Sequence, residues 1–315
     1  MLTVFIKILI IFVMIGIGYA ANRTKVLPDE SNEYLVNLLL IITSPCMLIG
    51  SITSNKLTAS TLNTTIQVMV GTLLFFFVAW AVSFVLLKIM RYEPKADRGV
   101  MMVIMCSVNS GFMGFPITKA IFGNEFLYYM SVSNMVFQFY CFFLAVIQMN
   151  YGSSRKIDVK GVFRYLSNPC MIAAILGMVL LFGGIKLPWY LMDLVNTIGD
   201  ATIPISMIVV GIQLGGSDLR RMIRNGKLLL ASLVNVVLMP VMTFFIVEAL
   251  PLLTWQTKLT LTFMTCFPCA VVVVAIAAKE QKNATLLAEG VALTTMLSLI
   301  TIPVAALFLT SYYLG

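Results

Sequence analysis

Two prolines, Pro116 and Pro268, lie in the middle of long apolar segments, in the strings NSGFMGFPITKA and FMTCFPCAVVVV. A proline has no N–H and clashes with the preceding helical turn, so each segment should be discontinuous there. New half-helices would then begin at Ile117 and Cys269, just after the prolines. The first amide groups of a helix carry partial positive charge and have no helical partner. The chemistry they offer is the binding of an anion such as a carboxylate.

The residues next to the prolines leave these donors open. Phe115 and Phe267 directly precede the two prolines, and neither has a side-chain acceptor that could cap the half-helix. The alternative is a pair of ordinary proline kinks whose donors are satisfied by neighbouring helices or water. Two such breaks in one chain favour a binding site.

Polar side chains inside the apolar segments should line the same cavity, because an unpaired polar group facing lipid is costly. The candidates are Asn109, Ser110, Asn134 and Gln138. Asn134 and Gln138 lie four residues apart and would share one face of a helix. Asn109 is the first candidate for a direct hydrogen bond to a substrate.

Two acids lie within apolar segments, Asp200 four residues before Pro204 and Glu289 in the last segment. An acid at membrane depth is a candidate for coupling to an ion, here H⁺ or Na⁺. The alternatives are that Asp200 is a structural carboxylate bonded to backbone donors near Pro204, and that Glu289 lies close to the membrane surface. We expect no other cofactor.

The rest of the chain must hold these groups inside a bilayer. Hydrophobic residues make up 60% of the chain and charged residues 11%, which cannot supply an ordinary soluble surface. Apolar runs repeatedly exceed the roughly 18 residues that mark a spanning helix. They cover residues 2–21, 31–54, 61–88, 98–121, 124–150, 166–184, 189–213, 228–250, 255–279 and 284–313. We therefore predict an all-α integral membrane protein with ten transmembrane helices, the fourth and ninth broken by proline and crossed.

Basic residues concentrate in alternate loops. One side of the predicted topology keeps only Lys7, Lys56, Lys119, Lys186 and Lys258, and the other side holds the rest of the 21. The positive-inside bias makes the second side cytoplasmic and places both termini outside the cell (inner) membrane. The net charge of +8 is thus a topology signal, and no nucleic-acid partner is expected.

The two halves of the chain resemble each other. In residues 37–50 and 196–211 an asparagine precedes a proline by eight residues and a threonine precedes it by two. The first pair of prolines, Pro45 and Pro204, lies 159 residues apart, and the pair Pro116 and Pro268 lies 152 residues apart. The two separations are nearly equal. We predict a duplicated five-helix unit, whose second copy must be inverted because five crossings are an odd number. The expected units are residues 1–150 and 166–315, joined by a cytoplasmic connector at 151–165.

Motifs for catalysis are missing. The sequence has no histidine, no G-x-S-x-G, no H-E-x-x-H and no Walker motif, so we do not expect an enzyme. Cys266 and Cys269 form a C-x-x-C that straddles Pro268 without a second pair of ligands. We interpret them as packing residues and predict no metal site.

With these motifs in place, the chain resembles the auxin efflux carrier family in its compact bacterial form. The resemblance covers nearly all of the sequence and is carried by TSP at 43–45, NSGFMGFPI at 109–117, TIP at 202–204, FP at 267–268 and the stretch 275–303. Plant members have a long central cytoplasmic loop that residues 151–165 do not supply. The acid that the family carries in its second helix is also absent, since residues 37–50 contain none.

The resemblance implies two inverted five-helix repeats, in a fold similar to that of bile-acid sodium symporters and sodium/proton antiporters. Helices 1, 2, 6 and 7 would form a scaffold, through which a homodimer would assemble, and helices 3–5 and 8–10 a transport domain. Family members move organic anions such as auxin, malonate or malate. The residues that match the two crossovers are Asn109, Phe115, Pro116, Phe267 and Pro268.

The sequence therefore predicts a secondary transporter of small organic anions. The alternative is an inorganic-cation or proton antiporter on the same architecture, but such antiporters place acids beside the crossing and none lies near Pro116 or Pro268. A membrane enzyme is a further alternative, but the chain lacks the catalytic motifs named above. A channel is the remaining alternative, but paired half-helices suit alternating access better than they suit a continuous pore.

Overall fold

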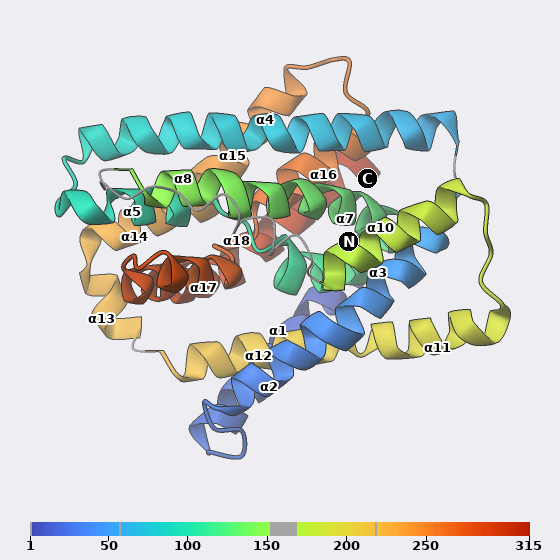
Figure 1. Cartoon of the computed structure of the whole chain (residues 1–315), viewed down its shortest axis with the longest axis horizontal. Helices are drawn as coiled ribbons and strands as arrows, with labels where there is room; N and C mark the ends of the chain where they lie inside the picture. The colour runs from blue at the N-terminus through green and yellow to red at the C-terminus, as the bar shows by residue number, and fades with distance from the viewer. Residues whose placement is uncertain (1, 57, 152–168, 218) are drawn as a thin grey trace.

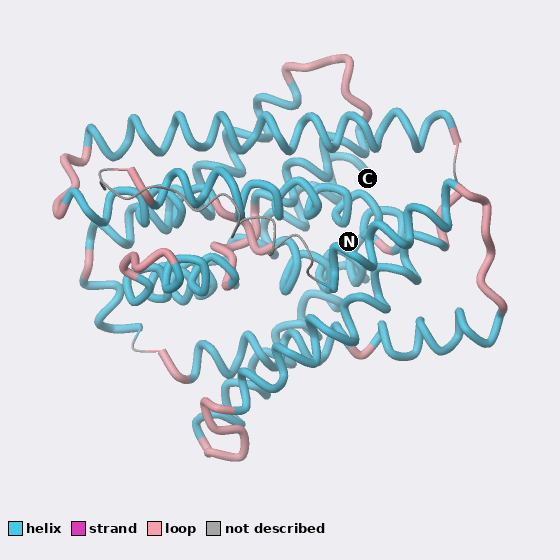
Figure 2. Tube along the Cα trace, in the orientation of Figure 1, coloured by secondary structure: helices cyan, strands magenta, loops and turns pink. Residues whose placement is uncertain are grey.

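The computed structural model describes residues 2–56, 58–151, 169–217 and 219–315, and every regular element in these ranges is helical (Figure 2). Seven helical spans in these ranges are long and apolar enough to cross a membrane: Phe5–Arg23, Ser31–Thr53, Ala59–Ile89, Lys95–Phe122, Trp189–Gly215, Gly226–Glu248 and Ala284–Leu314. The predicted all-α membrane class is confirmed. The predicted connector 151–165 lies outside the described residues except for Tyr151.

Helices of the first half are α1 (Leu2–Arg23), α2 (Ser31–Leu38), α3 (Ser44–Thr53), α4 (Ala59–Ile89), α5 (Arg98–Cys106), α6 (Phe115–Phe122), α7 (Asn124–Phe139) and α8 (Ala145–Met149). Those of the second half are α10 (Pro169–Phe182), α11 (Trp189–Asp200), α12 (Thr202–Gly215), α13 (Leu219–Arg224), α14 (Gly226–Leu233), α15 (Met239–Glu248), α16 (Trp255–Thr265), α17 (Val272–Lys279) and α18 (Ala284–Leu314). Each of the ten predicted ranges thus contains helix. That all ten cross the membrane, as two inverted repeats, stays a prediction.

Several helices widen by one π turn just before a proline. The turns η1 (Leu39–Thr43), η3 (Ser110–Gly114) and η5 (Val234–Leu238) lead into α3, α6 and α15, each of which has a proline in its first turn. A further π turn, η4 (Tyr140–Leu144), joins α7 to α8, and η2 (Lys95–Asp97) is a short 3₁₀ turn before α5. Because proline cannot donate to the preceding turn, the ladder loosens there without the helix ending.

The two halves of the chain are packed into one another. Helix α1 packs most extensively against α12, and α3 packs against α10 and α11. In Figure 1, α4 runs along one long edge of the molecule and α2, α11 and α12 lie along the opposite edge. The span Lys95–Phe122 lies between them and is the most enclosed of the seven, with 89% of its apolar window buried. This central span carries the first proline break.

Glycines allow α1 and α12 to approach closely. A Cβ added to Gly18 would lie 2.2 Å from the carbonyl oxygen of Ile208, and one added to Gly211 would lie 2.1 Å from that of Ile15. Small residues at such crossings let backbones pack directly, which is how helices associate in lipid. The neighbouring Gly16 has nothing within 4 Å of its added Cβ.

We expect Gly18→Ala to destabilise the protein by roughly 1–3 kcal/mol, because the new methyl group would overlap backbone that cannot move aside. The matched control is Gly16→Ala, which adds the same methyl group to the same helix in open space and should stabilise slightly. Thermal unfolding of the purified proteins in detergent measures both. Equal midpoints for the two variants would show that the α1–α12 contact is looser than described.

Candidate functional site

The first break lies before the predicted position. Helix α5 ends at Cys106, the next three residues are not helical, and the chain turns again from Ser110. Pro116 and Ile117 are therefore inside a helical stretch, and the expectation that a half-helix begins at Ile117 is wrong. The proline is accommodated by the π turn in front of it. The residue that caps the new helix is Asn109, whose Oδ1 accepts from the backbone N–H of Phe112 at 3.2 Å.

The second break is longer than predicted. Helix α16 ends at Thr265 and α17 begins at Val272, so the expectation of a half-helix from Cys269 is also wrong. The N–H of Cys269 is not open either, because it donates to Oγ1 of Thr294 in α18 at 3.1 Å.

The two breaks meet directly. The N–H of Asn109 donates to the carbonyl oxygen of Pro268 at 2.7 Å. Oγ of Ser107 lies 2.8 Å from Sγ of Cys269. Segments more than 150 residues apart in the chain are thus joined by their backbones.

A cavity of about 80 Å³ lies where the breaks meet. Its lining is Leu40, Ser44, Asn109, Gly111, Phe112, Phe115, Asn134, Phe137, Gln138, Cys170, Ala270 and Val272. Four predicted site residues, Asn109, Phe115, Asn134 and Gln138, are therefore brought together. The lining also joins both halves of the chain, because Cys170 belongs to α10 and Val272 begins α17.

The polar groups of this cavity are uncharged and partly unpaired. Asn134 Oδ1 accepts from Ser110 Oγ at 2.7 Å, so Ser110 orients a lining residue. Gln138 is 8% exposed and its Oε1 has no hydrogen-bond partner among the described residues. Asn109 is 3% exposed, and no hydrogen bond described for it uses its Nδ2. Buried polar atoms without partners are unusual in proteins and indicate a place for a ligand or water.

Open backbone donors adjoin the same cavity. Gly114 is the first residue of its turn to bond back along the chain, to the carbonyl of Asn109 at 2.9 Å, and Val274 is the first in α17, bonding to Val271 at 3.1 Å. The amides just before them have no helical partner, and of these only that of Phe112 has a side-chain cap described above, the Oδ1 of Asn109. Gly111 and Val272 come from these two helix starts and both line the cavity. Two helix N-termini, each with partial positive charge, therefore adjoin one small space.

The other predicted site residues lie beside this space. Pro268 and Cys269 bond across the crossing as described, and the ring of Phe267 lies 3.4 Å from a Cβ placed on Gly114. Ile117 lines a separate apolar hollow with residues of α1 and α18. Pro116 is buried but does not line the cavity. These residues shape the crossing and are not placed to touch a ligand in the cavity.

Asp200 has a partner that the sequence did not suggest. Its Oδ1 lies 2.6 Å from Nζ of Lys119, an ion pair between α11 and α6. The Asp200 side chain is 66% exposed and that of Lys119 only 19%. Lys119 was expected at the outer end of the fourth predicted helix, 98–121, and it lies within α6, one turn after Phe115. Glu289 is partly buried in the second turn of α18, and neither acid lines the cavity.

Several residues of the site were missed. Ser44 lies in the TSP string, and its place before a proline inside an apolar run was an available signal. Asn235, a solitary amide within an apolar run, donates to the carbonyls of Met105 and Ser107. Ala270 and Val272 carry no chemical signal, because they enter the lining through their backbone position alone.

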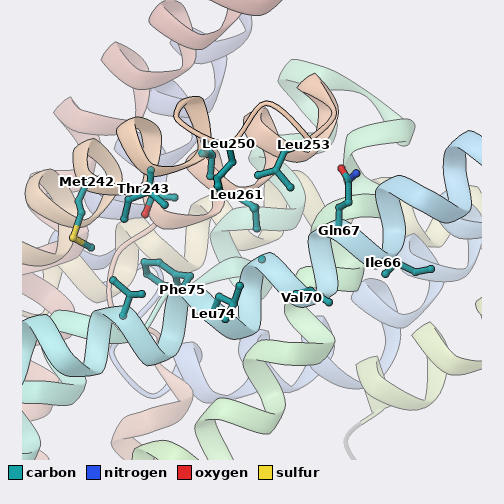
Figure 3. Close-up of a pocket in the computed structure, with 14 residues that line it drawn as sticks. Ile66, Gln67, Val70, Leu74, Phe75, Met242, Thr243, Leu250, Leu253 and Leu261 are labelled. Carbon is teal, nitrogen blue, oxygen red and sulfur yellow. The ribbon is translucent and has the colours of Figure 1, made fainter.

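A larger hollow lies elsewhere, between α4 and α15 (Figure 3), and has a volume of about 330 Å³. Its lining is almost entirely aliphatic and includes the exposed Ile66, Val70 and Leu74. The amide of Gln67 is already bonded to Leu252, Thr254 and Thr257. The exposed side of α4 lines this hollow, and its other polar side chain, Thr243, donates to the carbonyl of Met239 at 2.8 Å.

The described ranges contain no candidate metal site. They contain no group of three or more His, Cys, Asp or Glu side chains that could hold a metal ion. Cys266 and Cys269 are both buried free thiols.

Comparison with known proteins agrees with the membrane-spanning helices and the polar site described above. The profile of a family described as membrane transport protein matches residues 3–161 and 153–306. This chain belongs to the auxin efflux carrier family. The family resemblance stated from its motifs is confirmed, and the chain is a multi-pass membrane transporter.

Two archaeal proteins are similar along almost the whole chain. An uncharacterized transporter of Methanocaldococcus jannaschii is 24% identical over 300 residues, covering 94% of this chain and 95% of its own. An uncharacterized transporter of Methanothermobacter thermautotrophicus is 23% identical over 304 residues, with 94% and 95% coverage. The similarity therefore extends over nearly the full length of both relatives.

Proposed function

We propose that this auxin efflux carrier family member is a secondary transporter of small organic anions, with the cavity at the crossing as its substrate site. The observation that carries the proposal is the meeting of two helix starts at one small space lined by partly unpaired amides. Such a site offers several donors and no fixed negative charge, which suits a carboxylate. The volume of about 80 Å³ suits a small acid in this conformation.

The packing supports alternating access by inverted repeats. If the halves repeat, the contact of α1 with α12 corresponds to that of α10 with α3, and both pairs are extensively packed. These helices correspond to the scaffold expected from the family. The cavity lies between scaffold residues such as Ser44 and Cys170 and transport-domain residues such as Asn109 and Gln138. A site at such a boundary can be exposed alternately to each side.

The orientation is part of the same proposal. Basic residues follow the predicted cytoplasmic ends of the helices, for example Arg23 at the end of α1 and Lys279 at the end of α17. Both termini would then lie outside the cell (inner) membrane. The scaffold helices would also supply the surface for a homodimer.

The second candidate, a cation or proton antiporter on this architecture, is less well supported. Antiporters of this kind are expected to place acids beside the crossing, and the cavity lining contains no acid. Asp200 pairs with Lys119 and does not line the cavity. Whether H⁺ or Na⁺ is coupled to the anion is decided by flux measurements under defined gradients.

A thermal-shift screen of the purified protein tests the proposal, because a ligand that binds the folded state raises its unfolding temperature. The probes are acetate, lactate, malonate, malate and indole-3-acetate over several pH values. We expect at least one acid to stabilise the protein, and saturable uptake of the same acid in proteoliposomes. Stabilisation by Na⁺ alone, with no acid effective, would favour the antiporter.

We expect the acid that binds to be strongly preferred over its neutral amide. Each helix start contributes roughly half a positive charge, and a charge-assisted hydrogen bond is worth about 1.5–3 kcal/mol. The amide should therefore compete at least about tenfold more weakly. Competition between the two at one pH measures this. Equal inhibition by acid and amide would mean that the helix starts do not face the substrate.

A further inference from the structure

One side chain outside the cavity holds the first break in place. Asn235 lies in the π turn η5 and is 1% exposed. Its Nδ2 donates to the carbonyl oxygens of Met105 at 3.3 Å and Ser107 at 2.9 Å. Its Oδ1 is buried without a partner among the described residues. Since the facing groups only accept, the amide nitrogen must point toward them.

The two carbonyls that Asn235 reaches are groups that the break itself leaves unpaired. The last carbonyls of a helix have no partner further along the chain, and α5 ends at Cys106. In a membrane interior, water is not at hand to bond them, so an unpaired carbonyl is costly. One amide nitrogen carries two hydrogens and serves both. The open conformation of the break therefore depends on a residue from the other half of the chain.

The backbone held by Asn235 leads directly into the crossing. Ser107 Oγ accepts from the N–H of Ala270 at 3.4 Å, and Ala270 lines the cavity. Two residues after Ser107, the N–H of Asn109 bonds to the carbonyl of Pro268 at 2.7 Å. Asn235 itself does not line the cavity. Its effect on a ligand must pass through the segment between Met105 and Asn109.

We propose that Asn235 is a positioning residue of the substrate site: by bonding Met105 and Ser107 it fixes the spacing of the two breaks and aims Asn109 into the cavity. This inference builds on the proposed function. Asn235 belongs to η5, and the helix that contains it contributes no residue to the cavity lining. The proposal therefore gives a residue outside the cavity a role in shaping it. Both the hydrogen bond from Asn109 to Pro268 and the position of Ala270 depend on Asn235.

The main test is hydrogen–deuterium exchange on Asn235→Leu, which keeps a similar volume and removes the donor. We expect exchange in the segments 105–115 and 266–272 to rise about tenfold, as for the loss of roughly one net hydrogen bond, while the ends of α4 and α18 keep parent rates. The matched control is Ser232→Ala on the same helix, because Ser232 is fully buried and its Oγ has no partner. That control should exchange like the parent.

A binding measurement separates positioning from simple stability. For the acid that gives the parent its largest thermal shift in the panel above, we expect the Kd to rise about tenfold in Asn235→Leu, with Asn235→Gln, which keeps the amide, recovering part of the loss. Asn235→Ala, which also lacks the donor, should behave like the leucine variant.

The outcomes decide the matter separately from the proposed function. Exchange that rises equally along the whole chain, or a Kd equal to the parent's in Asn235→Leu, would overturn the positioning role. If no acid in the panel binds the parent, the anion proposal falls, and the exchange pattern still decides whether Asn235 holds the break. Should Asn235→Leu not fold, Asn235→Ala and Asn235→Gln carry the same comparison.

Discussion

Asn109→Ala should weaken binding of the transported acid by about tenfold to a hundredfold while the protein still folds, because a hydrogen bond to a charged group is worth roughly 1.5–3 kcal/mol. The side chain lines the cavity, and its Nδ2 is not used in any hydrogen bond described for it. The backbone N–H that joins Asn109 to Pro268 remains in the variant. Titration of the acid against the purified variant measures the loss.

The substitution also removes a helix cap, which alone costs about 0.5–2 kcal/mol of stability. Asn225 provides a matched control, because its Oδ1 caps α14 with the same 3.2 Å bond to a backbone N–H and it does not line the cavity. Asn225→Ala should lower stability by a similar amount and leave affinity unchanged. Asn109→Asp keeps a capping oxygen but adds negative charge, so it should fold and fail to bind the acid. If Asn109→Ala binds the acid with the same Kd as the parent protein, Asn109 does not contact the substrate.

Charge reversal at Lys119 should reduce transport by about two- to fivefold, because two like charges would face each other at the α6–α11 contact while solvent screens a pair whose acid is 66% exposed. Lys119→Glu would place a second carboxylate against Asp200, whose Oδ1 is 2.6 Å from the lysine nitrogen. The double variant Lys119→Asp with Asp200→Lys restores opposite charges and should recover most of the rate. Initial uptake rates in proteoliposomes compare the three proteins.

A second ion pair serves as the control for this experiment. Arg98 and Glu93 are 3.2 Å apart, and the acid, with 58% of its side chain exposed, is about as accessible as Asp200. They lie close in sequence at the start of α5, so their charges do not join α6 to α11. Arg98→Glu should change transport little. If it impairs uptake as much as Lys119→Glu, the effect is one of surface charge.

Asp200→Asn separates pairing from ion coupling. The amide keeps the shape of the carboxylate and can accept from Lys119, but it cannot exchange a proton or hold a cation by charge. If Asp200 couples transport, gradient-driven accumulation is lost and counterflow, which needs no net ion movement, survives in part. If its role is the pair with Lys119, both assays change together, and this is the result that the observed geometry favours.

The sequence alone determined the class of the protein and the neighbourhood of its site. Apolar run length predicts membrane helices because the bilayer sets that length, and proline predicts a disturbed helix because it lacks an N–H. Both are local properties of the chain. The amides Asn109, Asn134 and Gln138 could be named in advance, since an unpaired polar group is not left facing lipid.

Only the tertiary structure decided where the half-helices begin and which donors stay open. Cys269 was expected to present its N–H to a ligand, but Thr294, on a different helix, already accepts that bond. Lys119 was expected at the outer end of the fourth helix, but its partner, Asp200 of the other half, was not indicated by the sequence. Asn235 supports a break that lies more than 100 residues away in the chain. The physical reason is common to all three: a proline determines that a helix must loosen, but each freed donor and acceptor bonds to whichever group the packing of distant segments brings within reach.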